Sequence, residues 1–211
     1  MPLLKISENK FPEWSEVKKI SQLTIEPNST AEITKSFPKY ALFVISGECS
    51  IRTNGYEKIF LENDYLFSEK RNISIKSSNH KIEIVLVEGS WGEELGGSAV
   101  FRMSKHSTPR NIGDPVDYSR TNDFDNHYHD FDEYWIILKG SGLAVSEGVK
   151  YKFSGGDIIA TRMGDHHDLS EVHEDIQGIY FETSLRGQKR LGHLWEHTHG
   201  KPDLSYRENK K

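Results

Sequence analysis

The chain has 211 residues, of which 35% are hydrophobic and 28% are charged, and its formal net charge is -5. This mild acidity argues against nucleic acid as the main partner, because binding to phosphates needs a concentrated basic face. The single cysteine, Cys49, excludes an intrachain disulfide and fits a reducing compartment. No signal peptide is recognisable, and the apolar runs are far shorter than the ~20 residues of a membrane helix. We therefore expect a cytoplasmic protein without a membrane partner.

The predicted elements begin with a short helix over residues 14–20. Four segments with strand character follow, each rich in Ile, Val, Leu, Tyr or Phe and bounded by turn-forming residues. They cover residues 40–47, 81–89, 133–145 and 177–185. A second short helix is predicted over residues 187–197. Short strands between turns, without a long helical period, are typical of a sandwich or barrel. The sequence therefore predicts an all-β fold with few short helices.

An internal repeat relates the two halves of the chain without a gap. A glycine, a hairpin tip and an aspartate recur at the same spacing, in the pairs Gly47 and Gly140, Asn54-Gly55 and Glu147-Gly148, Asp64 and Asp157. Similar apolar runs precede both glycines. The repeat predicts a duplicated β unit, with halves at about residues 20–95 and 110–185.

Two domains follow from this repeat. Residues 1–100 are predicted to form the N-terminal β unit, and residues 101–211 the C-terminal β unit with a charged tail. The polar stretch 93–126 between the halves is rich in turn-forming residues, so we expect it to form surface loops.

Titratable side chains precede the third apolar segment. His127, His129 and Glu133 share strand parity, so they point to one face of a regular strand. Two histidines at positions i and i+2 have Cα atoms ~7 Å apart, which lets both imidazoles reach one ion at ~2.1 Å. The longer reach of Glu133 supplies a third donor. A fourth donor is expected from the stretch around His166 and His167.

These two stretches resemble the motifs of the cupin superfamily. The first motif, G-x5-H-x-H-x3/4-E-x6-G, is matched by His127, His129, Glu133 and Gly140, with Thr121 in place of the leading glycine. The second, G-x5-P-x-G-x2-H-x3-N, is matched by Gly156, Gly164 and His167, with Arg162 and Glu171 in place of proline and asparagine. The two motifs together span residues 121–171 and form a specific signal.

The resemblance implies a jelly-roll barrel, the double-stranded β-helix, with one divalent metal near its mouth. The implied ligands are His127, His129, Glu133 and His167. The motif spacing selects His167 rather than His166, although a one-residue slip of the strand would reverse that choice. Together with the repeat, the resemblance indicates a duplicated barrel, a bicupin.

The N-terminal unit is predicted to lack a metal site. The gapless alignment places Thr34, Ser36 and Tyr40 opposite the first three ligands, and Ser74 opposite His167. These residue types do not form a competent set of ligands for a transition metal. We therefore expect one metal ion per chain.

Other residues near the motifs have two interpretations. Arg162 is either a solvated turn residue or a mouth residue that receives an anionic substrate through two hydrogen bonds. Tyr128 is expected to pack in the outer layer, and either Tyr180 or Phe181 to line the cavity. The remaining histidines are interpreted as surface or hydrogen-bonded residues, namely His106, His173, His193, His197 and His199.

Four protein ligands leave one or two positions open on the ion, as in a catalytic site. Imidazole and carboxylate ligands suit Fe, Mn, Ni, Zn or Cu, and the sequence does not choose among them. The sequence predicts a metal-dependent enzyme acting on a small polar metabolite, a sugar or a hydroxy or keto acid. Isomerase, epimerase or lyase chemistry would need a base, for which Glu133, Glu171 or His166 is available.

Two alternatives remain open, an Fe(II)-dependent dioxygenase and a non-catalytic sensor module that holds a metal or ligand. A homodimer is expected from the family resemblance.

Overall fold

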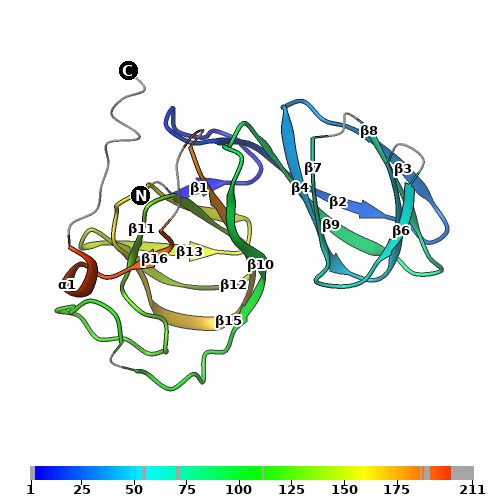
Figure 1. Cartoon of the computed structure of the whole chain (residues 1–211). Helices are drawn as coiled ribbons and strands as arrows, with labels where there is room; N and C mark the ends of the chain where they lie inside the picture. Colours follow the sequence, from blue (N-terminus) through cyan, green and yellow to red (C-terminus); the bar gives the residue numbers. More distant parts are fainter. Residues whose placement is uncertain are drawn as a thin grey trace. The chain divides into compact units, whose positions relative to one another are not determined.

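The computed structural model describes residues 3–53, 56–69, 72–110, 112–185, 187 and 191–200. The chain forms two compact units, one of Glu16–Ser90 and one that combines Met1–Ser15 with Trp91–Lys211 (Figure 1). In the described part both units are built from strands, and the helix there is α1 (Glu196–His199). Among the described residues, no helix is long and apolar enough to cross a membrane.

The unit Glu16–Ser90 consists of two four-stranded antiparallel sheets. One sheet has the order β2 (Val17–Ile25), β9 (Ile82–Gly89), β4 (Lys39–Ser46), β7 (Tyr65–Ser68). The other has the order β3 (Thr30–Thr34), β8 (Asn72–Ser77), β5 (Cys49–Thr53), β6 (Tyr56–Phe60). Alternate side chains of both sheets form one apolar core, which includes Tyr40, Leu42, Ile51, Ile75 and Ile84. Inward residues that alternate with outward ones are the pattern of a β-sandwich or flattened barrel.

The second unit is organised around two long strands. Its six-stranded sheet has the order β1 (Leu3–Lys5), β14 (Asp157–Thr161), β12 (Asp132–Ser146), β15 (His167–Thr183), β10 (Leu95–Met103), and β13 (Val149–Ser154) also pairs with β12. A two-stranded sheet joins β11 (Tyr128–His129) to β16 (His193–Leu194). The apolar core cluster includes Trp135, Ile137, Phe153, Leu169 and Ile176. The long strands β12 and β15 run side by side in Figure 1.

The predicted repeat is visible in the backbone of both units. Gly47 and Gly140 have φ angles of +85° and +87°, and a register shift precedes each of them. Asp64 and Asp157 each accept a hydrogen bond of 2.8 Å from the backbone N–H three residues earlier. The Asn54-Gly55 tip lies outside the described residues. The same glycine bulge and the same aspartate turn occur in each unit, and the predicted duplicated all-β fold is confirmed.

Three predicted elements need correction. Residues 14–20 are not a helix, because β2 begins at Val17 and pairs with β9 along its length. The predicted helix 187–197 is reduced to α1 at Glu196–His199, while residues 188–190 lie outside the described part. The polar stretch 93–126 is not all loop, since β10 pairs with β15 between Leu95 and Met103. In each case strand pairing with a distant segment outweighs the local propensity of the residues.

The two units also differ from the predicted domains 1–100 and 101–211. Leu3 pairs with Ile159 and Lys5 with Asp157, so β1 belongs to the C-terminal unit. The Lys5 ammonium forms an ion pair with the buried Asp157 carboxylate. The predicted boundary therefore moves to residues 15/16 and 90/91. The predicted charged tail falls in residues 201–211, outside the described part.

Candidate metal centre

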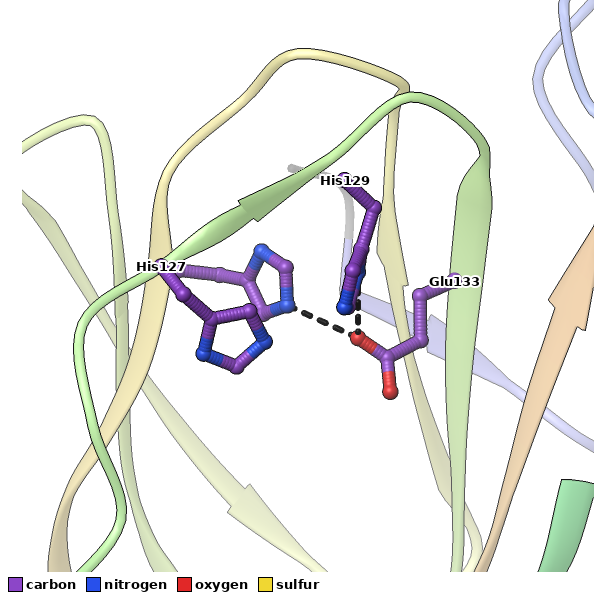
Figure 2. A group of neighbouring side chains, drawn as sticks. His127, His129 and Glu133 are labelled. Carbon is purple, nitrogen blue, oxygen red and sulfur yellow. Dashed lines mark hydrogen bonds and ion pairs between the residues drawn. The ribbon is translucent and has the colours of Figure 1, made fainter. Parts of the chain in front are cut away.

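Three segments of the C-terminal unit bring the candidate ligands together. His127 and His129 flank Tyr128 at β11, Glu133 lies near the start of β12, and β15 begins at His167. His127 and His167 are joined by two backbone hydrogen bonds, of 3.2 Å and 2.8 Å. Figure 2 shows the rings of His127 and His129 and the carboxylate of Glu133 directed toward one another.

The four predicted ligands form one buried cluster. One donor atom from each of His127, His129, Glu133 and His167 lies within 4.8 Å of the others. His167 Nε2 is 2.7 Å from Glu133 Oε2, and His129 Nδ1 is 3.4 Å from the same oxygen. None of the four residues is exposed by more than 5%. The structure therefore places His167, and not His166, in the cluster.

The histidine rings are oriented by backbone carbonyls. His127 Nδ1 lies 3.0 Å from the carbonyl oxygen of Asp125, and His167 Nδ1 lies 3.1 Å from that of Asp165. A ring that donates its Nδ1–H to a carbonyl keeps the lone pair on Nε2 for a metal. The buried Nδ1 of His129 has no well-formed hydrogen bond. Three nitrogen donors and one carboxylate therefore fit a divalent transition metal.

Burial and pairing set the protonation of these groups. Burial lowers the pKa of His127 to about 3, and burial also lowers the pKa of His129. Burial alone would raise the pKa of Glu133, but the neighbouring imidazoles of His129 and His167 hold it well below its ordinary value. Burial would likewise lower the pKa of His167, yet the Glu133 carboxylate raises it. Without an ion, these shifts favour the ionised form of Glu133 and the protonated form of His167.

Metal affinity is expected to fall as the pH falls through the raised pKa of His167, which lies above the ordinary value of 6.5. A metal ion must displace the proton that His167 holds, which costs about tenfold in affinity per pH unit below that pKa. His127 and His129 compete only at lower pH, because their pKa values are lowered. Calorimetric titration in buffers of different ionisation enthalpy should detect about one released proton per ion. An affinity that stays constant between pH 8 and pH 5.5 would contradict this account.

A cavity of about 470 Å³ opens beside the cluster. Its lining includes three of the four donors, His127, His129 and Glu133. The remaining lining is aromatic, aliphatic and charged: Phe101, Arg102, Met103, Asp123, Phe124, Asp125, Trp135, Leu169, Tyr180, Glu182 and His193. Of the two residues predicted as alternatives, Tyr180 lines the cavity, whereas Phe181 packs edge-on against Trp91. A small molecule in this cavity could approach the ion.

No family model matches the chain. The chain is 39% identical over 202 residues to the uncharacterized protein y4oW of Sinorhizobium fredii, covering 94% of this chain and 92% of the relative. The chain belongs to the family of y4oW. It is also 39% identical over 74 residues to the HTH-type transcriptional activator RhaR of Pectobacterium atrosepticum. That match covers 35% of this chain and a quarter of the activator's length.

The fold matches solved bicupin structures. Oxalate decarboxylase of Bacillus subtilis superposes with a TM-score of 0.57 at 10% sequence identity, over 78% of this chain and 68% of that chain. The cupin motifs predicted from the sequence therefore lie in a cupin fold. The low identity relates the two proteins by fold alone.

Two predicted catalytic residues of this cupin site lie elsewhere. Glu171 pairs with His173 at 2.8 Å and does not line the cavity, because a register shift between Leu143 and Ala144 breaks the alternation of β15. Arg162 contacts Asp165 at 3.4 Å and is also absent from the lining. Neither Glu171 nor Arg162 therefore lines this cavity, and their predicted catalytic roles stay predictions.

His166, the alternative ligand and a candidate base, lies outside the cluster. Its Nε2 lies 2.8 Å from Asp114, and its backbone N–H donates to the Glu147 carboxylate at 2.5 Å. Tyr128 is buried and donates its hydroxyl to the carbonyl of Gly200, so it packs as predicted.

Sequence reasoning missed two residues at the cupin site, Asp125 and His193. The His193 ring stacks on His127 with 3.6 Å between ring centroids, and its Nε2 lies 2.9 Å from Asp125 Oδ2. Asp125, His127 and His193 form a second group whose donor atoms could hold an ion. Asp125 stands two residues before the first motif histidine, and this spacing could have indicated that it lies near the site. His193 is distant in the sequence, and no sequence pattern placed it at the site.

The strand register shows what replaces the ligands in the N-terminal unit. Thr34 pairs with Asn72 and Ser74 pairs with Glu32, whereas His127 pairs with His167 in the C-terminal unit. Tyr40 pairs with Ser68 where Glu133 pairs with Thr161.

The gapless alignment holds for Tyr40 and Ser68. It does not hold at both Thr34 and Ser74, because these two residues do not pair with each other as His127 and His167 do. Within the described residues, the two groups of side chains able to hold an ion lie in the C-terminal unit.

Proposed function

We propose that the chain is a metal-dependent cupin enzyme that acts on a small polar metabolite by isomerase, epimerase or lyase-type chemistry. The observation that carries this proposal is the position of the donors: they are buried, yet three of them line a cavity. Structural metal sites are closed by protein ligands, whereas catalytic sites keep a position open toward the substrate. A cavity of about 470 Å³ has the size of a small-molecule pocket.

A bound ion would supply Lewis-acid polarisation of a carbonyl or hydroxyl group, with Fe, Mn, Ni, Zn or Cu all compatible with the donors. The residues of the chain supply the rest of the site. Phe124, Trp135 and Tyr180 offer apolar walls for the carbon skeleton, and Arg102 is also among the lining residues. We assign to Arg102 the anion-binding role that the sequence suggested for Arg162, because a guanidinium can bind a carboxylate through two hydrogen bonds.

Arg102→Ala is expected to raise KM for an acidic substrate by ~10–100-fold, the effect of losing a charged hydrogen bond of about 1.5–3 kcal/mol. Arg162→Ala is the matched control, since it removes the same side chain from outside the cavity lining. We expect the control to keep the wild-type KM. Steady-state kinetics on a hydroxy or keto acid that is turned over would measure both. Equal effects of the two substitutions would remove Arg102 from substrate binding.

The first experiment is metal analysis of protein purified without a chelating column. Apoprotein is then reconstituted separately with each of the five metals and screened against sugars and hydroxy or keto acids. We expect conversion under anaerobic conditions with at least one metal. If thermal-shift screening finds ligands but no metal supports their conversion, the enzyme proposal is wrong.

The same metal-reconstituted proteins distinguish two other functions. Oxygen uptake with Fe(II) that is absent with Mn(II) or Zn(II) would favour the dioxygenase. Ligand binding without turnover would favour a sensor module, an alternative supported by the 74-residue similarity to the activator RhaR. The homodimer and the cytoplasmic location stay predictions.

A further inference from the structure

Residues 191–200, here called the strap, lie against β11, which contains the candidate ligand His129 and directly follows His127. The strap contains β16 and α1, and β16 pairs antiparallel with β11 (Figure 1). In this pairing Leu194 is opposite Tyr128, and His193 is opposite the ligand His129. The strap therefore reaches the metal centre through backbone pairing, although it is distant in the sequence.

Three aspartates hold the strap through polar contacts. Asp130 accepts hydrogen bonds from the backbone N–H groups of Leu191 and Gly192, at 2.6 Å and 3.1 Å. Asp125 accepts one from the Trp195 indole at 3.0 Å. Asp114 accepts the backbone N–H of Glu196 at 2.8 Å and also contacts the His197 ring.

The apolar contribution of the strap comes mainly from Leu194, which is buried. A segment held by polar contacts over little buried apolar area can open at low cost.

His193 is the strap residue that meets the ligands. Its ring lies nearly parallel to that of His127, at 24°, with 3.6 Å between centroids, and it lines the cavity. Its Nε2 is 2.9 Å from the Asp125 carboxylate, while the Asp125 carbonyl orients His127 Nδ1 at 3.0 Å. Asp125 thus contacts both rings and fixes their mutual position.

We propose that His193 is a positioning residue for the metal centre: the strap places its ring on His127 and closes one wall of the cavity. This inference rests on the proposed metal site. The stacked ring restricts the tilt of His127, so that Nε2 stays directed at the ion. Indirect partners that orient a ligand typically contribute 10–100-fold to metal affinity.

A direct ligand role for His193 fits the geometry less well. Ligation uses a lone pair in the plane of the ring, whereas His193 presents its face to His127. Its Nε2 is already engaged with Asp125. Two ions per chain would nevertheless be the signature of ligation by Asp125, His127 and His193, and the experiment counts ions for that reason.

The test measures Co(II) binding to the full-length apoprotein and its variants by visible absorption and stopped-flow release to a chelator. His193→Ala should release Co(II) at least tenfold faster and change the d–d band, with one ion per chain retained. His193→Phe keeps a ring able to stack on His127 and should restore slow release. His173→Ala removes an imidazole that pairs with Glu171 outside the cavity, and it should behave as wild type.

Each other outcome has a defined meaning. Wild-type release and spectrum in His193→Ala would overturn the positioning role and leave the metal site standing. Two ions in the wild type and one in His193→Ala would make His193 a ligand, which also overturns it. Fast release in His193→Phe, equal to that of His193→Ala, would exclude ring stacking as the cause. A wild type that binds no Co(II) would overturn this inference and the proposed metal centre together.

Discussion

Replacement of His127 or His129 by alanine is expected to abolish metal binding and leave the fold intact. Each substitution removes one of four donors, so we expect affinity to fall by more than about 100-fold, the upper range for losing only an indirect partner. The apolar cluster around Trp135, Ile137 and Leu169 does not depend on either imidazole for its packing. Calorimetric titration measures the affinity. Thermal unfolding of the apoproteins should give Tm values within about 4 °C of the wild type, equivalent to roughly 1 kcal/mol.

The matched control is His173→Ala, which removes a surface imidazole outside the cavity lining. Added metal should raise the Tm of this control and of the wild type, because an ion that binds only the folded state stabilises it. The Tm of the ligand variants should not respond. Loss of folding in both ligand variants would show instead that the ion has a structural role.

Gly140→Ala is expected to destabilise the C-terminal unit strongly. Gly140 has φ +87°, and an added Cβ would collide with the carbonyl oxygen of Asp175 on the neighbouring strand. A positive φ costs a non-glycine residue about 1–2 kcal/mol, and a collision with backbone adds to that. We expect a loss of at least about 3 kcal/mol, or a Tm lowered by roughly 6–12 °C. Urea unfolding followed by tryptophan fluorescence measures the loss.

Gly156→Ala separates the two causes. Gly156 has φ +93°, but no heavy atom lies within 4 Å of the position its Cβ would take. It should therefore lose only the conformational cost of about 1–2 kcal/mol. Equal losses at both positions would mean that backbone conformation accounts for the whole effect and that the approach of the two strands contributes nothing.

The four clustered side chains were predictable because their spacing is a local property of one strand and one turn. Parity along β11 and the start of β12 places His127, His129 and Glu133 on one face, and the backbone pairing of His127 with His167 brings in the fourth donor. The repeated glycines Gly47 and Gly140 were informative for a similar reason, because a backbone position with positive φ favours glycine.

The misplaced and missed residues depend on information that local spacing does not contain. A register shift in the pairing of β12 with β15 takes Glu171 away from the cavity, and no sequence pattern announces a bulge at that point. His193 arrives through the pairing of two-residue strands at β11 and β16. The pairing of β1 with β14 joins residues 3–5 to residues 157–159, and such a distant pairing cannot be read from local spacing.

The position of β1 makes the first unit an insertion within the second rather than a preceding tandem copy. The C-terminal barrel takes its first strand from residues 3–5 and resumes at Trp91, with Glu16–Ser90 inserted between. In a fragment that starts at Trp91, β14 would keep its pairing with β12 but lose β1. The outer edge of β14, with the buried Ile158 and Ile159, would then have no strand partner. Bare apolar edges of this kind promote aggregation. A single-barrel protein is better obtained by excising residues 16–90 and joining the flanking segments with a short flexible linker.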